Sequence, residues 1–156
     1  MKVFRFRLES FLHLRSLTRE KCLKEYAQAI EERQRQEELR EMLSHKLAQI
    51  EAGVASKRQE GIRGSDQDVF LGSIEHAKVE LINQRVVASQ ALAEEEKKRT
   101  AYIEADIAEK TLLRLKEHRK EEHHRVQEAK EERALEDMIG ARHGFISPNE
   151  VSYETT

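Results

Sequence analysis

The feature that most constrains the fold is a long N-terminal stretch without a helix breaker. From Leu8 to Ala52 the chain contains neither glycine nor proline, so nothing in it terminates a helix. Apolar side chains recur there at steps of three and four residues, which gathers them on one stripe of a helix. Residues 8–52 are therefore predicted to form one helix. Its stripe, which continues to Val54, comprises Leu8, Leu12, Leu23, Tyr26, Ile30, Leu39, Leu43, Leu47, Ile50 and Val54.

A glycine-containing segment separates this helix from a second one. Gly53, Gly61 and Gly64 fall within residues 53–65, which are predicted to be the connection. Ser65 is predicted to cap the second helix by accepting a hydrogen bond from a backbone N–H of its first turn.

The second helix is predicted to span residues 66–139 and to end before Gly140. Residues 140–156 contain Pro148 and several small polar side chains, and they are predicted to be a disordered tail. Apolar or small residues keep a heptad phase along the first half of this helix. They are Phe70, Ile74, Ala77 and Leu81, continued by Gln84, Ala88 and Ala91, with a second stripe of Val79, Ile82 and Val86.

Two long helices joined by one connection predict an all-α fold, an antiparallel coiled-coil hairpin in which each stripe covers the other. With a rise of about 1.5 Å per residue, the first helix would be about 67 Å long and the second about 110 Å. The second helix is therefore predicted to overhang. With the turn centred near residue 59, Leu8 would lie opposite Lys110, and residues 111–139 would project beyond the first helix.

One segment of the first helix interrupts its apolar stripe. Residues 33–38 read RQRQEE and place no apolar side chain at the expected positions. The seam between the helices is predicted to be polar and looser there.

The first residues follow a different period from the rest of the chain. Phe4, Phe6 and Leu8 alternate with Arg5 and Arg7, which is the period of an extended strand. The hairpin places this segment at the base of the overhang. Two interpretations remain open: a short apolar cap on the end of the hairpin, or a docking surface shared with the overhanging helix.

The composition favours long helices over a compact globule. Charged residues make up 37% of the chain and aromatic residues 5%, and tryptophan is absent. Disorder of the main body is the competing interpretation, but the net charge is only −2 and apolar residues recur with helical spacing. A net charge near zero also argues against a nucleic-acid-binding protein.

Cysteine content and hydropathy bear on the compartment. Cys22 is the only cysteine, so no intrachain disulfide can form and a reducing cytoplasm is expected. No apolar run is long enough to cross a membrane, and charged residues interrupt the N-terminal apolar segment. We therefore expect a soluble, unprocessed protein without direct membrane insertion.

Sites for chemistry are not evident in the sequence. No glycine pattern matches a phosphate-binding loop, and the tetrapeptide GIRG at residues 61–64 is too short. His118, His123 and His124 lack the spacing of three or four residues that a two-histidine metal grip on a helix needs. Carboxylates on an exposed helix have no cleft that would shift their pKa values. The sequence therefore predicts no enzyme activity, no cofactor and no metal.

Two stretches resemble a known family. The opening FRFRLESFLHLRSLTREKCLKEYAQA is similar to the F-x-F-x-L-x-x-x-L-x-L-R start of the FliJ family, the small coiled-coil component of the bacterial flagellar type III export apparatus. The run LLRLKEHRKEEHHRVQEAKEERALEDMI resembles the closing helix of that family. The resemblance covers about residues 3–139, in the same two-helix order.

The resemblance implies a non-enzymatic stalk and adaptor. The end of the hairpin that holds both termini would enter the ring of the hexameric export ATPase, promote assembly of the hexamer and couple it to the export gate. Export chaperones are further implied partners, and the implied location is the cytoplasm, peripheral to the inner membrane. The implied ATPase-binding residues are Phe4, Phe6, Leu8, Leu12, Arg15, Leu115, Arg119, Arg125 and Arg133. Those implied for the cytoplasmic domain of the gate are Phe70, Ile74, Ala77 and Leu81, which the heptad pattern instead assigns to the core.

Three alternatives stay open at this point. The chain also fits the corresponding stalk of a virulence-type injectisome, which the sequence separates poorly from the flagellar protein. It fits a generic structural coiled coil that forms homo-oligomers and covers its overhang with another copy. An RNA-associated helical adaptor would use the basic residues of the overhang, although its acidic residues argue against this.

Overall fold

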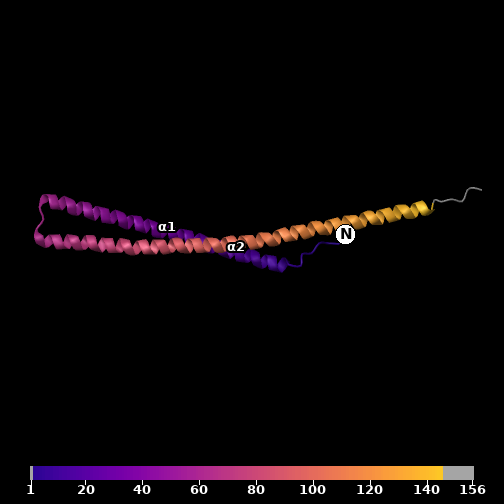
Figure 1. The fold of residues 1–156 in the computed structure, drawn as a ribbon, viewed down its shortest axis with the longest axis horizontal. Coiled ribbons are helices and arrows are strands. Elements are labelled where there is room, and N and C mark those ends of the chain that lie inside the picture. Colours follow the sequence, from indigo (N-terminus) through magenta and orange to yellow (C-terminus); the bar gives the residue numbers. More distant parts are fainter. Residues whose placement is uncertain (1, 146–156) are drawn as a thin grey trace, which may run out of the picture. The chain divides into compact units, whose positions relative to one another are not determined.

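The structure is a computed structural model that describes residues 2–145, and it contains two long α-helices. Helix α1 spans Glu9–Glu60 and helix α2 spans Gly64–Phe145 (Figure 1). The two helices pack against each other, and no strand occurs among residues 2–145. The all-α prediction is confirmed.

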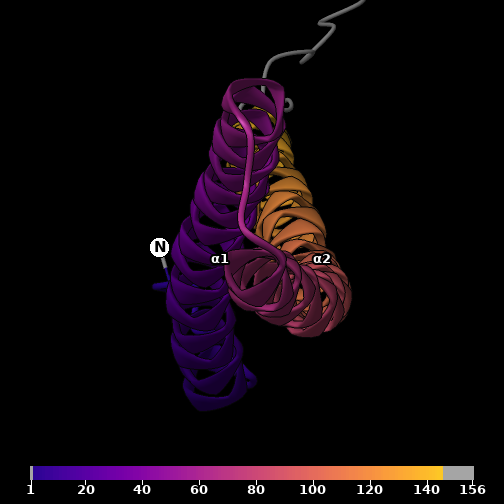
Figure 2. The same ribbon diagram turned by 90° about the vertical axis from the view of Figure 1, so that its left-hand side faces the viewer.

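The chain divides into two compact units. The hairpin unit comprises residues 14–109, and the terminal unit comprises residues 1–13 together with residues 110–156. In the hairpin unit α1 and α2 run antiparallel and are joined by residues 61–63, which face the viewer in Figure 2.

Helix α1 continues past the glycine at which it was predicted to end. Gly53 lies inside the helix, and Val54, the next residue, is buried. A glycine costs a helix interior about 1 kcal/mol relative to alanine, which the burial of a neighbouring side chain can offset. The helix ends at Glu60 because Gly61 takes a φ of +99°, a left-handed conformation that favours glycine.

Helix α2 also begins earlier than predicted. The backbone N–H groups of Asp66 and Gln67 donate to the carbonyl oxygen of Arg63, at 3.0 and 3.3 Å. Ser65 therefore lies within the first turn of the helix. The prediction that Ser65 precedes the helix and caps it is wrong. The connection shortens from the predicted residues 53–65 to residues 61–63.

The other end of α2 lies beyond its predicted limit of residue 139. Helical backbone continues through Gly140 and Gly144 to Phe145, so residues 140–145 do not belong to a disordered tail. Residues 146–156, the remainder of the predicted tail, lie outside the described residues.

Small side chains form the seam of the hairpin unit. Ala77, Leu81 and Ala88 are buried, as the heptad phase predicts. The second stripe on α2 differs, because Val79, Ile82 and Val86 each remain at least half exposed. The large apolar groups of α2 are thus divided between the seam and the solvent-facing side.

A polar layer crosses the seam where the apolar stripe of α1 is interrupted. The side-chain amide of Gln84, whose residue is only 9% exposed, donates to the backbone carbonyl oxygen of Gln36 at 3.1 Å and to its Oε1 at 2.7 Å. Nearby, Arg33 forms an ion pair with Glu95. The segment is polar, as predicted, and it is bonded across the seam; its looseness stays a prediction.

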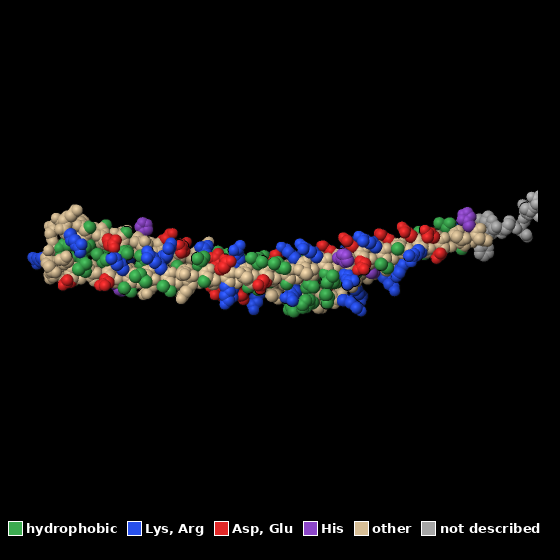
Figure 3. Space-filling view, in the orientation of Figure 1, with side chains coloured by type: hydrophobic (Ala, Val, Ile, Leu, Met, Phe, Trp, Pro, Cys, Tyr) green, Lys and Arg blue, Asp and Glu red, His purple; other side chains and the backbone are tan. Residues whose placement is uncertain are grey.

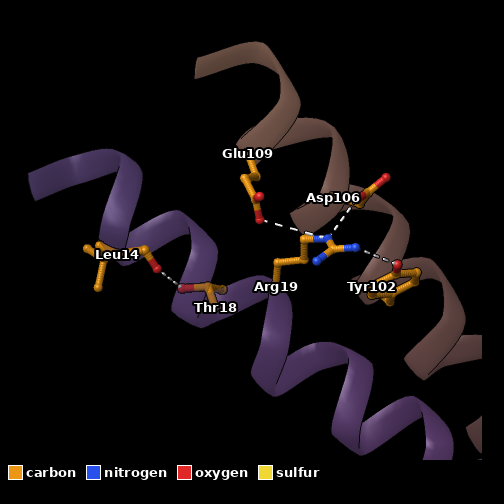
Figure 4. A network of polar contacts seen from close by, with 6 residues as sticks. All are labelled: Leu14, Thr18, Arg19, Tyr102, Asp106 and Glu109. Atoms are coloured by element: carbon orange, nitrogen blue, oxygen red, sulfur yellow. Dashed lines mark hydrogen bonds and ion pairs between the residues drawn. The ribbon is translucent and has the colours of Figure 1, made fainter. Parts of the chain in front are cut away.

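Further along the seam, ion pairs and hydrogen bonds join α1 to α2. Arg19 Nε donates to Asp106 Oδ1 at 2.8 Å and its Nη2 donates to the hydroxyl of Tyr102 at 3.3 Å, with Glu109 Oε2 at 3.8 Å (Figure 4). The hydrogen bond to Asp106 raises the pKa of the Arg19 guanidinium, because it stabilises the charged form.

A second interhelical ion pair has the same effect. Lys98 Nζ lies 3.1 Å from Glu25 Oε2, and the hydrogen bond to Glu25 raises the pKa of Lys98. These pairs fix which residues of α1 lie opposite which residues of α2.

Two glycines of the hairpin are expected to respond to alanine in opposite ways, one lowering and the other raising the free energy of unfolding. We expect Gly61→Ala to lower the free energy of unfolding by about 1 kcal/mol, because alanine is strained at a positive φ. Gly72→Ala lies in a helix interior with open space around the added methyl group, and it should raise the free energy by about 0.5–1 kcal/mol. Urea unfolding followed by circular dichroism measures the free energy of unfolding of both variants. A change in the same direction for both would contradict the turn geometry.

The polar layer can be tested by a double-mutant cycle. Gln36→Leu should lower the free energy of unfolding by about 1 kcal/mol, because the buried amide of Gln84 loses one of its acceptors. Adding Gln84→Leu removes the buried N–H of Gln84 that the first substitution leaves without an acceptor. The double variant should therefore be at least as stable as the wild type. Gln90→Leu, at an exposed position of α2, is the control. Additive effects of the two substitutions would show that the glutamines do not interact.

Candidate functional site

The terminal unit begins with a non-helical segment, residues 2–8, whose last two residues form a turn before α1. Its alternation of period two has a structural counterpart, since Phe4 and Phe6 are half-buried whereas Arg5 and Arg7 are exposed. The segment leads into α1 through a hydrogen bond from the Glu9 backbone N–H to the Phe6 carbonyl oxygen at 3.2 Å. The phenylalanines are therefore partly covered by the protein, whereas the arginines are accessible to solvent.

The covered surface belongs to α2. The ring centroids of Phe4 and His123 are 5.7 Å apart, and Lys116 Nζ donates to Glu9 Oε1 at 2.8 Å. The predicted register placed Leu8 opposite Lys110, about two helical turns away from this pairing. The shorter connection accounts for the difference, because it moves the centre of the turn from residue 59 towards Ile62.

A groove of about 790 Å³ lies between the N-terminal segment and α2. Its apolar lining comprises Val3, Phe4, Phe6, Leu8, Leu115 and Val126. Cationic side chains also line it, from Lys2, Arg5, Arg7 and Arg119. A surface of this kind can bury apolar side chains of a ligand and attract negative charge at the same time.

Two further side chains of α2 belong to this groove. Glu122 Oε2 lies 3.3 Å from Arg119 Nη1, so one of the groove cations is paired on the surface of the helix. The Nδ1 atom of His123 is buried and has no hydrogen-bond partner among the described residues. The ring of His123 therefore lies beside that of Phe4, at a tilt of 57°, while Nδ1 has no partner among the described residues.

Five of the nine predicted ATPase-binding residues line this groove: Phe4, Phe6, Leu8, Leu115 and Arg119.

The other four are distributed differently. Leu12 is buried, and Arg125 and Arg133 are exposed on α2 outside the groove lining. Arg15 belongs to the hairpin unit.

Sequence reasoning missed several residues of the groove. Arg5 and Arg7 were considered only as the polar half of an alternating pattern, and Lys2 was not considered at all. His123 and Val126 were assigned to a bare overhang, but the N-terminal segment covers α2 up to that level. Beyond it the overhang is genuine within the terminal unit, since residues 130–144 are all exposed.

The residues implied for the export gate lie in the hairpin unit. Ala77 and Leu81 are buried at 4% and 5% exposure, whereas Phe70 and Ile74 are half-buried. Lys57 Nζ lies over the ring of Phe70, 4.8 Å from its centroid, near the connection. Of the four, the two residues nearest the connection offer the accessible surface.

Residues 2–145 contain no cluster of three or more His, Cys, Asp or Glu residues that could hold a metal ion. Within the same range, neither helix has an apolar stretch long and uncharged enough to cross a membrane.

Fold and site together define a protein with a hairpin of two long helices and, in its terminal unit, a groove lined by apolar and cationic residues. The family profile described as "Flagellar FliJ protein" matches residues 4–144. The chain belongs to the FliJ family, a non-catalytic component of flagellar protein export. No curated protein and no solved structure matches the chain.

The packing of the N-terminal segment can be measured by hydrogen exchange. Replacing both Phe4 and Phe6 by alanine should speed exchange of the amides of residues 115–126 about tenfold, because α2 loses apolar cover and opens more readily there. Val69→Ala is the control, since Val69 is 66% exposed and belongs to the hairpin unit. Unchanged exchange in the double variant would contradict the contact.

Proposed function

We propose that this protein is the stalk and adaptor of the flagellar type III export apparatus. It inserts into the ring of the hexameric export ATPase, promotes assembly of the hexamer and couples the ATPase to the export gate. The flagellar family assignment supports this role over that of an injectisome stalk.

The observation that carries the proposal is the groove of the terminal unit. It combines residues from the start of the family match with residues some 110 positions later, so two distant parts of the matched region build one surface. Phe4, Phe6 and Leu115 supply apolar anchors, and Arg119 supplies a cation. A ring that receives the stalk would contact this surface and the exposed residues 130–144 that follow it.

The second partner in the proposal is the cytoplasmic domain of the export gate. Phe70 and Ile74 are its proposed contacts, because they retain accessible surface near the connection. Ala77 and Leu81 would support these contacts from within the seam. The protein would then work in the cytoplasm, at the inner membrane when docked, and export chaperones are further proposed partners.

The ATPase role can be tested by reconstitution. We expect the full-length chain to raise ATP hydrolysis and hexamer formation by the purified export ATPase. A chain lacking residues 1–7, and one ending at Leu115, should each lose most of this effect, because each removes one side of the groove. Val79→Ala with Ile82→Ala, two exposed apolar residues of the hairpin unit, is the control.

Circular dichroism and sedimentation velocity test whether misfolding or self-association causes any loss of stimulation. Both truncated chains should keep the hairpin helices, so that lost stimulation is not lost folding. Full stimulation by both truncations would overturn the assignment of the groove. Stable self-association without any binding to the ATPase would favour a structural homo-oligomer instead.

A further inference from the structure

Charge is not spread evenly over the terminal unit. Residues 2–8 and 110–126 contain nine Lys or Arg residues and three Glu residues, whereas residues 127–144 contain three Lys or Arg and five Asp or Glu residues. The net charge of the whole chain is −2. A basic surface therefore lies beside the groove, where Lys and Arg side chains flank hydrophobic atoms (Figure 3).

The cations of the N-terminal segment are not neutralised internally. Lys2, Arg5 and Arg7 form no ion pair with any other residue in the range 2–144. Arg119 is paired with Glu122, but its side chain is 61% exposed. Exposed guanidinium groups bind carboxylates in a planar, two-point geometry, so these arginines are available to an anionic partner.

The apolar lining decides which kind of anion fits. Phe4, Phe6, Leu115 and Val126 lie among the cations and expose a surface that phosphate groups would leave uncovered. A chain of phosphates would satisfy the charges alone, whereas a protein segment can present carboxylates and a large apolar side chain together. The volume of about 790 Å³ is enough for several side chains.

We infer that the groove binds an acidic protein segment in which carboxylates flank a large apolar side chain. This inference rests on the proposed function in one respect, since that function places the segment on the export ATPase. Binding then combines electrostatic attraction, which salt weakens, with apolar burial, which salt leaves in place.

Charge reversal measures the electrostatic part. Binding of the full-length chain to the hexameric export ATPase is compared at about 50 mM and about 500 mM salt. Arg5→Glu with Arg7→Glu should weaken binding tenfold or more at the lower salt, and by a much smaller factor at the higher salt. Lys21→Glu with Lys24→Glu, an equal change of charge at exposed positions of the hairpin unit, should have little effect.

A synthetic probe keeps this inference separate from the identity of the partner. A labelled peptide of Glu and Leu residues should bind the full-length chain, and a matched peptide of Lys and Leu should not. Phe4→Ala and the double arginine variant should each weaken binding of the Glu-Leu peptide. Single-stranded RNA of equal charge should bind more weakly than that peptide.

The outcomes distinguish the two proposals. If the Glu-Leu peptide binds as expected but the ATPase does not, the partner assignment fails and the chemistry of the groove stands. If the arginine variant and the lysine control lose ATPase binding equally, or if RNA binds better than the peptide, the acidic-segment inference is overturned. Binding of the ATPase that neither salt nor charge reversal weakens would also overturn it while leaving the ATPase role intact.

Discussion

The structure depends on pairing one narrow stripe of α1 with one narrow stripe of α2. A chain with 37% charged residues has too few large apolar groups for a core, so each helix can bury only one face. The buried positions of the α2 stripe are correspondingly small, as at Ala77 and Ala88. Polar contacts also cross the seam, from Gln84 and from ion pairs such as that of Arg19. These contacts determine the register of the two helices more than they add buried surface.

Much of this arrangement could be predicted from the sequence, because helical periodicity and missing helix breakers are local signals. The limits of the helices could not. Gly53 and Gly61 are the same residue type, yet Gly53 lies in the helix and Gly61 follows its end. Gly53 is next to the buried Val54, whereas Gly61 has the positive φ that ends the helix. The error at Gly53 lengthened the connection and shifted every expected pairing across the hairpin, including that of Leu8.

The candidate site shows the same division between local and distant information. The alternation of apolar and basic residues matches a difference in exposure, since Phe4 and Phe6 are half-buried and Arg5 and Arg7 are exposed. Sequence could not show that His123 and Val126 lie beneath that segment, because their proximity follows from the register of helices far apart in the chain. The basic excess beside the groove could not be predicted either, because charges that balance over the whole chain need not balance on one surface.

The exposed end of α2 has a consequence for how the molecule responds to heat. Residues 130–144 are all exposed, so their helix is maintained mainly by its own backbone hydrogen bonds. A helix of that kind loses structure gradually from its free end, whereas paired helices unfold together. Ellipticity would therefore decline over a broad range of temperature before the cooperative transition of the hairpin begins.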